Sequence, residues 1–395
     1  MIIPRRYADI QAGEFSRVFQ LQRQHFNTNT IIEWEKMFAD YIGAKHAIAI
    51  GSGRLAMTLI LKSFNFEPGS EIIIPAYTLK DLIPLIQSLN LKPIPADIDK
   101  GTFNIMPESV LNRITGKTKA ILALHIFGNP CKIDKLKEIA DSHNLKLIED
   151  CAHSAGSQFA GKMTGSFGDA GFFSFETIKP INTYGGGMIV SNDKELVDNI
   201  RLNIKTLLPS DKILGKVKSA YIERFLFFTS LAYFPLRFLA SKKWSKRMNT
   251  LYRMLHHAPK QDRQYSSVQA SLGLEKIKTL NERMDNRREK AHYFISLLPD
   301  DIQPQVVLEN SFSNYYFFVA LLPDSANKLR KILLKHGFDA GVKDEIADNC
   351  AQMLKFNNCP NVEYVYENAI HLPIHENIKK EKIEYLAKII KKQYQ

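Results

Sequence analysis

Short runs of β-branched and other apolar residues recur along the first half of the chain, separated by stretches with helical periodicity. The runs lie at 46–50, 71–75, 119–127, 146–150, 170–175 and 187–191. Apolar runs without polar alternation are typical of strands that are buried on both faces. The helical stretches between them, such as Leu55 to Lys62 and Ile133 to Ser142, supply the crossovers that parallel strands require. The pattern predicts an α/β fold with a mainly parallel central sheet.

The pattern changes after residue 261. A polar helical run at 268–294 leads to the strand-like segment SNYYFFVALLP at 313–323, then to a helix, the segment IHLPIH at 370–375 and a closing amphipathic helix. This order predicts a smaller α+β domain at the C-terminus. We therefore divide the chain into an N-terminal arm at 1–30, a large domain at 31–205, an insert at 206–261 and a small domain at 262–395.

Composition narrows the class of protein. An apolar fraction of 45% over 395 residues is enough for a full core. The four cysteines, Cys131, Cys151, Cys350 and Cys359, form no CxxC pair, so we expect neither a disulfide framework nor a metal site. The first fifteen residues lack the apolar core of a signal peptide, which favours a cytoplasmic protein.

The net charge of +12 arises largely in the insert. Residues 201–260 hold 13 Lys and Arg against only Asp211 and Glu223. The apolar stretch from Phe225 to Leu236 is too short to span a bilayer. Its basic and aromatic flanks suit a peripheral contact of 221–248 with the inner membrane face. The alternative is that the apolar residues of the insert pack on a second subunit or over the active site. The aromatic residues of the insert cluster with aliphatic residues and do not alternate with basic ones, which argues against a nucleic-acid-binding role.

One lysine stands in a setting that suits covalent chemistry. Lys179 follows the end of a predicted strand at Ser174 by five residues, and the glycines at 185–187 open the next strand. A lysine that forms an imine must be held partly deprotonated at an active site. Glycines let the backbone turn tightly beside a bound group. A solvated loop lysine is the alternative interpretation of Lys179 taken alone.

Two further elements complete a possible cofactor site. Asp150 ends a predicted strand and could pair with the protonated pyridine nitrogen of pyridoxal 5′-phosphate (PLP), although a helix cap would also explain it. His153 is close enough in sequence to reach the cofactor ring. A Gly-Ser-Gly turn before Arg54 would present backbone N–H groups to a phosphate, with the Ser174 hydroxyl beside them.

In combination these segments resemble the DegT/DnrJ/EryC1/StrS family of sugar aminotransferases, which are PLP enzymes of fold type I. The resemblance rests on AIAIGSG, HIFGNPCKID, IEDCAHSAG, GSFGDAGFFSFETIK, YGGGMIVSND and SSVQASLGLEKI, and covers most of the chain. It implies that Lys179 forms the Schiff base and that Asp150 is the pyridine partner. It also implies that Gly53, Arg54 and Ser174 hold the phosphate, and that His153 contacts the ring where the family often has glutamine.

Three positions depart from the family pattern. Arg54 stands where the family usually has threonine, and Leu79 stands where an aromatic residue usually stacks on the cofactor ring. Arg263 is one position out of register with an arginine that a neighbouring subunit often contributes. We carry the cofactor-binding role to Leu79 and Arg263 by position alone.

The resemblance implies a homodimeric aminotransferase that passes an amino group, usually from glutamate, to a keto sugar carried on a nucleotide or, if the membrane hypothesis holds, on a lipid. Family members that act as dehydratases replace the lysine by histidine, so Lys179 favours transamination. A PLP-dependent dehydratase or epimerase, and a regulator that retains the fold without turnover, are the alternatives.

Overall fold

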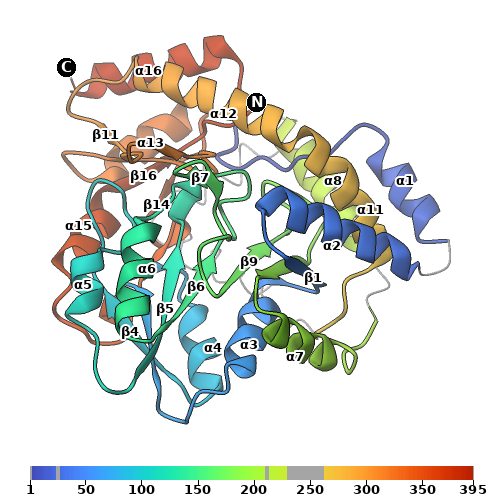
Figure 1. Cartoon of the computed structure of the whole chain (residues 1–395). Coiled ribbons are helices and arrows are strands. Elements are labelled where there is room, and N and C mark those ends of the chain that lie inside the picture. The colour runs from blue at the N-terminus through green and yellow to red at the C-terminus, as the bar shows by residue number, and fades with distance from the viewer. Residues whose placement is uncertain (1, 24–26, 210–212, 229–261, 395) are drawn as a thin grey trace.

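A seven-stranded sheet forms the centre of the computed structural model, which describes residues 2–23, 27–209, 213–228 and 262–394 (Figure 1). The strand order is β1-β10-β9-β6-β5-β2-β4, and β10 alone runs antiparallel to its two neighbours. The strands are β1 (His46–Ile50), β2 (Glu71–Pro75), β4 (Lys92–Ala96), β5 (Thr118–Leu124), β6 (Lys146–Asp150), β9 (Ala170–Ser174) and β10 (Gly187–Ser191). The mainly parallel sheet expected from the apolar runs is thereby confirmed.

Helices cover both faces of this sheet because both faces are apolar. Ile72 and Ile74 of β2 pack into one core cluster, whereas Ile73 between them faces another. The first face is covered by α3 (Gly53–Ser63), α4 (Leu82–Ser88) and α7 (Lys194–Ile204). The second is covered by α2 (Thr28–Ile42), α5 (Pro107–Leu111), α6 (Ile133–Ser142) and α11 (Ser267–Lys276).

The C-terminal part builds a second, smaller sheet. Its strand order is β11-β13-β16-β14, and all of its pairs are antiparallel. The strands are β11 (Gln303–Pro304), β13 (Phe318–Leu321), β14 (Gly341–Val342) and β16 (Ala369–Leu372). A separate apolar cluster joins this sheet to α12 (Leu280–Ile295), α13 (Ala326–Lys335) and α16 (Lys380–Tyr394). The part of the chain from α12 onward is thus an α+β unit with its own core, whereas α11 packs on the central sheet.

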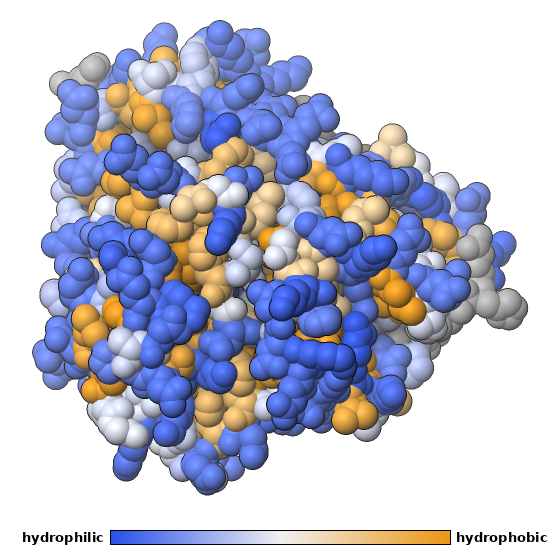
Figure 2. Space-filling model, viewed as in Figure 1, coloured by the Kyte–Doolittle hydropathy of each residue, from blue (hydrophilic) through white to orange (hydrophobic). Residues whose placement is uncertain are grey.

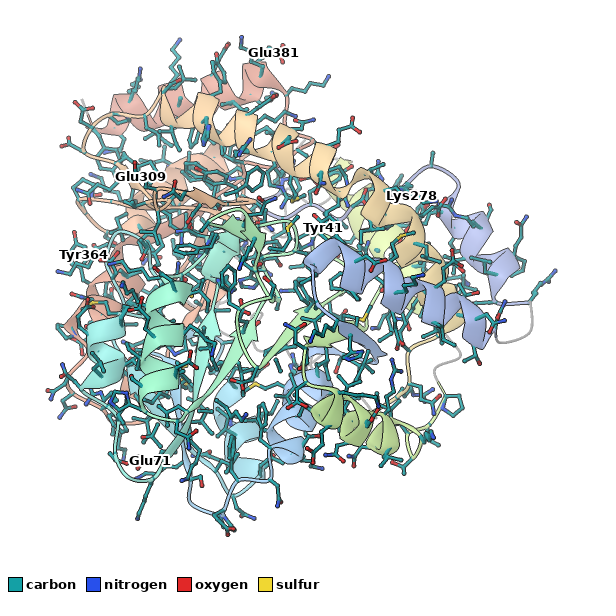
Figure 3. The ribbon with its side chains drawn as sticks, viewed as in Figure 1. Tyr41, Glu71, Lys278, Glu309, Tyr364 and Glu381 are labelled. Atoms are coloured by element: carbon teal, nitrogen blue, oxygen red, sulfur yellow. The ribbon has the colours of Figure 1, made fainter. Side chains whose placement is uncertain are left out.

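The two parts meet at the carboxyl ends of the parallel strands. The side-chain amide of Asn314 donates to the carbonyl oxygens of His153 and Ala155, both at 2.9 Å, just beyond the end of β6. Strands β3 (Tyr77–Thr78) and β15 (Asp348–Asn349) pair across the same junction. Glu71, at the amino end of β2, lies at the opposite end of the large domain, at the bottom of Figure 3. Ligands of open α/β sheets bind at the carboxyl ends, so the junction is where a site is expected.

One strand boundary differs from the expected one. The run at 119–127 yields a strand only to Leu124, because the chain turns at once into a short 3-10 helix, Ile126–Gly128, with Phe127 at a φ of 60°. Of the insert, the structure describes 206–209, 213–228 and no more, so most of the predicted membrane segment at 221–248 lies outside the described residues.

The described portion of the insert forms α8 (Leu214–Phe228), which packs on the N-terminal arm and on α1 (Glu14–Leu21). Its outer face carries exposed apolar side chains, Ile222, Phe225 and Leu226. Most of the molecular face drawn in Figure 2 is hydrophilic. Within the described ranges, no helix combines the length and the hydropathy that crossing a bilayer requires.

Candidate active site

Lys179 lies in the loop that links β9 to β10, at the carboxyl edge of the sheet. The loop is shaped by its own backbone, since the amide of Lys179 donates to the carbonyl of Glu176 at 2.9 Å and those of Thr183 and Gly185 donate to Phe175. The Lys179 ammonium lies 4.9 Å from the ring centre of Tyr316, in the small domain. Burial lowers the pKa of Lys179 to about 8, partly opposed by the charge of Asp150 and aided by Arg6. Such a lysine is poised for imine chemistry.

Asp150, the last residue of β6, is buried beside this lysine. One carboxylate oxygen accepts the backbone N–H of Ala152 at 3.0 Å. Burial nevertheless raises the pKa of Asp150, and the Ala152 N–H and the charge of Lys179 offset that effect only in part. A buried carboxylate of this kind gains from a further positive partner. The protonated nitrogen of a pyridine ring is such a partner, so Asp150 fits the role that the sequence suggests.

Next to Asp150 the sheet carries a fully buried polar cluster of His125, Glu149 and Cys151. The side-chain nitrogen, oxygen and sulfur atoms of these residues that could coordinate a metal ion lie within 4.8 Å of one another. The carboxylate of Glu149 lies 3.0 Å from His125 Nε2 and accepts backbone N–H groups from residues 165, 167 and 168. His125 Nδ1 in turn accepts the N–H of Cys131 at 3.2 Å. The carboxylate and the imidazole form hydrogen bonds with each other and with backbone N–H groups. The cluster therefore stabilises the strand ends that carry Asp150.

His153 presents a ring toward the same junction. It stacks on Tyr316 with 4.6 Å between ring centres, and its Nδ1 accepts the N–H of Phe127 at 3.3 Å. Burial, reinforced by the charge of Lys179, holds the pKa of His153 well below its usual range. The imidazole is therefore neutral with its proton on Nε2. That N–H can donate to an oxygen on a cofactor ring, which suits the predicted contact.

The amino end of α3 forms a cradle for an anion. Ser52 caps the helix by accepting the N–H of Leu55 at 3.1 Å. A Cβ added to Gly53 would lie 3.2 Å from the Cβ of Ser174, so a larger residue would press Ser174 away from the helix end. The backbone N–H groups at this end and the Ser174 hydroxyl suit a phosphate. With Asp150, His153 and Lys179, these residues fit PLP.

Two of the departures from the family pattern lie together. Arg54, in the first turn of α3, has its guanidinium 3.2 Å from the carboxylate of Asp81, and both side chains are partly exposed. Leu79, two residues before Asp81, leaves 45% of its surface exposed. The charge of Arg54 makes a minor contribution to the lowered pKa of Lys179. The predicted contact of Arg54 with the cofactor phosphate stays a prediction.

Arg263 lies beside the turn that precedes α3. Its backbone carbonyl abuts Gly51, since a Cβ added there would lie 2.0 Å from that oxygen. Its side chain is exposed and donates to the carbonyl of Pro209 at 3.5 Å. The cofactor-binding role of Arg263 stays a prediction.

A family model, the DegT/DnrJ/EryC1/StrS aminotransferase family, matches residues 10–391. The chain belongs to this family. Among its relatives, GDP-perosamine synthase of Caulobacter vibrioides is 41% identical over 172 residues, which cover 44% of this chain and 46% of that protein. GDP-4-keto-6-deoxy-D-mannose 3-dehydratase of Escherichia coli is 27% identical over 91% of both chains.

Solved structures of other proteins show the same fold. The aminotransferase TlmJ from Streptoalloteichus hindustanus superposes with a TM-score of 0.79 at 19% identity, covering 100% of this chain and 99% of that one. The Streptococcus pneumoniae aminotransferase Spr1654 in its PLP form gives a TM-score of 0.78 at 20% identity, with 99% and 98% covered. Fold type I and the family resemblance drawn from sequence are thereby confirmed.

The sequence missed several residues that the family fold brings to the site. Tyr316 supplies the ring under Lys179, and Arg6 reaches the same wall from the N-terminal arm. His371 stacks on the adjacent Phe317 with 4.1 Å between ring centres. The aromatic run at 315–318 reads as a buried strand, so periodicity gave no sign that Tyr316 turns toward Lys179. Only the motif IHLPIH gave a hint of His371.

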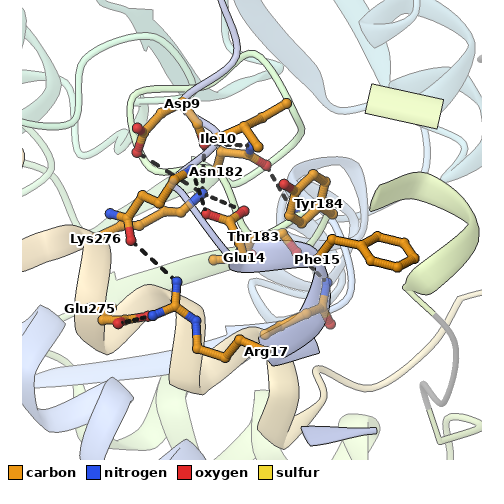
Figure 4. A network of polar contacts seen from close by, with 12 residues as sticks. Asp9, Ile10, Glu14, Phe15, Arg17, Asn182, Thr183, Tyr184, Glu275 and Lys276 are labelled. Atoms are coloured by element: carbon orange, nitrogen blue, oxygen red, sulfur yellow. Dashed lines mark hydrogen bonds and ion pairs between the residues drawn. The ribbon is translucent and has the colours of Figure 1, made fainter. Parts of the chain in front are cut away.

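A buried polar network holds the loop that follows Lys179 (Figure 4). Lys276 Nζ donates to the carbonyl of Asp9 at 2.7 Å and to the carboxylate of Glu14 at 3.0 Å, and both charged side chains are fully buried. The side-chain amide of Asn182 donates to the same Asp9 carbonyl at 3.2 Å. The network thus ties the N-terminal arm to the Lys179 loop and to α11.

We expect Lys276→Met to destabilise the protein by about 3 kcal/mol, because it leaves the Glu14 carboxylate buried without its cation. The measurement is the free energy of unfolding from urea titration. Lys278→Met is the matched control, since Lys278 is exposed two residues away. Equal stability of the two variants would contradict the network's importance.

The lowered pKa of Lys179 predicts how the protein without cofactor captures PLP. With a pKa near 8, about half of the amines are free at pH 8, against well under 1% for an ordinary lysine. The capture rate should therefore rise from pH 6.5, pass its midpoint near pH 8 and level off by pH 9.5. Stopped-flow absorbance measures this rate. A rate that still rises tenfold per pH unit above pH 9 would show an unperturbed lysine.

Proposed function

We propose that this protein is a PLP-dependent aminotransferase that converts a keto sugar into an amino sugar, with glutamate as amino donor. The observation that carries the proposal is Lys179, with its pKa lowered by burial, beside the buried carboxylate of Asp150 at the carboxyl edge of the sheet. When bound, PLP supplies an electron sink that stabilises negative charge on the substrate carbon.

Each residue of the site has a distinct task in this proposal. Asp150 keeps the pyridine nitrogen protonated. Ser174 and the amino end of α3 anchor the phosphate and so fix the plane of the ring. Lys179, as a free amine with a pKa near 8, takes the proton from the α-carbon of the donor and delivers a proton to the cofactor. When the acceptor sugar reacts, Lys179 moves a proton in the opposite direction.

The names of relatives support a nucleotide-linked sugar as acceptor. One is the GDP-perosamine synthase already mentioned, and another, dTDP-3-amino-3,6-dideoxy-alpha-D-galactopyranose transaminase of Aneurinibacillus thermoaerophilus, is 39% identical over 44% of this chain and 47% of that protein. Because both alignments span under half of each protein, the sugar and its nucleotide belong to the proposal.

The test is the half-reaction with L-glutamate. Purified protein loaded with PLP should lose its absorbance near the visible edge, form one equivalent of pyridoxamine phosphate and release 2-oxoglutarate. Adding GDP- or dTDP-linked 4-keto sugars should reverse the spectral change. A protein that binds PLP but yields no pyridoxamine phosphate with any amino acid donor would refute the aminotransferase proposal.

The dehydratase is the second candidate, because a 3-dehydratase aligns with 91% of the chain. Retention of Lys179 speaks against it, because the resemblance implies that dehydratases of the family have histidine in place of this lysine. The distinguishing result is the product: an aminotransferase releases an amino sugar, whereas a dehydratase releases a dideoxy sugar and ammonia. Mass spectrometry of the product separates the two.

We further propose that the protein works in the cytoplasm as a homodimer and that the insert touches the inner membrane face. The exposed apolar residues Ile222 and Phe225 of α8, together with the basic composition of 201–260, favour this contact and leave room for a lipid-linked acceptor.

The membrane contact predicts binding to anionic vesicles. Wild type should sediment with vesicles of phosphatidylglycerol and phosphatidylcholine, and the double variant Ile222→Asp, Phe225→Asp should do so several-fold less. Leu111→Asp, an exposed apolar residue of the large domain, is the matched control. Wild type that ignores the vesicles, or a dimer that dissociates in the double variant, would instead favour a subunit contact.

A further inference from the structure

An arginine of α12 holds the backbone next to Lys179. Arg283, in the first turn of that helix, donates from Nη2 to the carbonyl oxygen of Pro180 at 2.9 Å. Pro180 directly follows Lys179 and is buried. Because proline has no N–H, its carbonyl is the backbone group through which Pro180 can be anchored by a hydrogen bond. The guanidinium therefore fixes the loop one residue away from the lysine.

The same guanidinium contacts three other parts of the chain. Its Nη1 lies 3.3 Å from the carboxylate of Asp9, in the N-terminal arm, and 4.0 Å from that of Glu376, in the small domain. Its Nη2 also donates to the carbonyl of Lys276, at the end of α11, at 3.4 Å. Only 15% of the Arg283 side chain is exposed, so salt and water screen these contacts little. The arm and the Lys179 loop thus meet at one cation.

Asp9, which lies opposite this guanidinium, is itself held in place. Its carbonyl accepts Lys276 Nζ at 2.7 Å and the side-chain amide of Asn182 at 3.2 Å (Figure 4). The side-chain oxygen of Asn182 in turn accepts the backbone N–H of Tyr184 at 2.8 Å. The arm therefore supports the Lys179 loop at two points, directly at Asn182 and through Arg283 at Pro180.

The place of the Lys179 amine depends on this support because the side chain is long. An ammonium at the end of a flexible four-carbon stem moves with the backbone that carries it. The N–H of Lys179 is bonded to the carbonyl of Glu176, which fixes the preceding side of the loop, and Arg283 fixes the following side. Where reacting atoms must be aligned, a misplacement of about 1 Å can slow the chemical step roughly 100-fold.

We propose that Arg283 is a positioning residue for Lys179, which keeps the amine in its reactive place by anchoring the Pro180 carbonyl, with Asp9 as the partner that orients the guanidinium. The inference rests on the proposed function and adds to it a residue that acts on the lysine through the backbone. A network that only stabilises the fold would leave the reactivity of Lys179 unchanged, so the two roles can be separated.

The first measurement is the capture of PLP by cofactor-free protein, followed by stopped-flow absorbance between about pH 6.5 and pH 10.5. Wild type should show its midpoint near pH 8. In Asp9→Asn the Asp9 carbonyl and its two contacts are kept, but the guanidinium loses the charge that orients it. An amine released toward solvent titrates like an ordinary lysine, so we expect the midpoint to rise by about one pH unit or more.

The direction of this shift separates positioning from simple electrostatics. By charge alone, removal of the Asp9 carboxylate would disfavour the protonated amine and lower the midpoint. Loss of positioning raises it. Arg283→Met should raise the midpoint as well, and Arg283→Lys, which keeps a cation and a donor, should raise it less. The charged groups that act on Lys179 in the structure, Asp150, Arg6, Glu176 and Arg54, are the same in all of these variants.

The second measurement is the half-reaction of PLP-loaded protein with L-glutamate. We expect the rate at saturating glutamate to fall roughly 10- to 100-fold in Arg283→Met, because the amine is misplaced for proton transfer. The apparent Kd for glutamate should stay within about twofold of wild type, since Arg283 acts on the lysine and not on the substrate. Asp9→Asn should lower the rate by a smaller factor.

Arg288→Met is the matched control on the same helix. The Arg288 guanidinium pairs with Asp285 at 3.5 Å and lies 3.9 Å from the ring centre of Phe312. Its loss should leave the capture midpoint and the rate unchanged. Thermal melting of every variant checks the fold. If Arg283→Met melts early, the isosteric Asp9→Asn and the conservative Arg283→Lys carry the comparison.

A raised capture midpoint in Asp9→Asn, with slower chemistry at unchanged glutamate affinity in Arg283→Met, supports the positioning role. If the folded variants keep the wild-type midpoint and rate, or if the midpoint of Asp9→Asn falls, the proposal is overturned. If wild type captures PLP but does not react with glutamate, the proposed function fails, and the capture midpoints alone decide the role of Arg283.

Discussion

The Lys179→Ala variant is expected to lose the glutamate half-reaction by at least about 10³-fold, because it removes the group that moves the proton between donor carbon and cofactor. The Asp150 carboxylate and the anion cradle at Ser174 stay in place, so the variant should still bind PLP. The measurements are pyridoxamine phosphate formation and exchange of the glutamate α-proton with deuterated solvent. Both should fall together.

Two controls separate chemistry from folding in this experiment. Lys162→Ala removes an exposed lysine from the short hairpin strand β8 (Lys162–Met163) and should react at the wild-type rate. A small primary amine added to Lys179→Ala should restore part of the proton exchange, because it replaces the missing base. Exchange in Lys179→Ala at the wild-type rate would mean that another group moves the proton.

The Asp150→Asn variant is expected to lower the rate of the half-reaction roughly 10³-fold, comparable to the loss of one strong electrostatic contact in a transition state. The amide can still accept the N–H of Ala152 but carries no charge to hold a proton on the pyridine nitrogen. The PLP affinity should change much less, since the phosphate cradle is untouched.

The stability of the Asp150→Asn variant is a second, independent measurement of the role of Asp150. Burial raises the pKa of Asp150, so its charge is held at a cost in the free protein. Replacing it by a neutral isostere should leave the free energy of unfolding of cofactor-free protein unchanged or slightly higher. Asp134→Asn, on the exposed face of α6, is the control for both the rate of the half-reaction and the free energy of unfolding. A rate within tenfold of wild type would show that Asp150 does not act on the cofactor.

Much of the fold follows from local pattern. The apolar runs are buried on both faces in the structure, as Ile72, Ile73 and Ile74 illustrate, and such runs are typical of strands between two helical layers. Asp150 and Ser174 end strands, so their meeting at one edge of a parallel sheet could be foreseen. The Lys179 loop follows from the same reasoning together with the family resemblance.

The remaining part of the site depends on contacts between distant segments. Arg6, Tyr316 and His371 come together only because the small domain and the N-terminal arm fold over the strand ends. The strand-like run around Tyr316 hides a turn at Tyr315, whose φ is 45°. The salt bridge of Arg54 with Asp81 likewise joins residues from two separate segments of the large domain.

The most direct test of the central claim is the site of covalent attachment of PLP. The purified protein is incubated with PLP, reduced with borohydride, digested and analysed by mass spectrometry. We predict one phosphopyridoxyl group per chain, on the peptide that contains Lys179, and none at that position when Lys179→Ala is treated in the same way. Labelling spread over surface lysines, or no stoichiometric label on Lys179, would contradict the account.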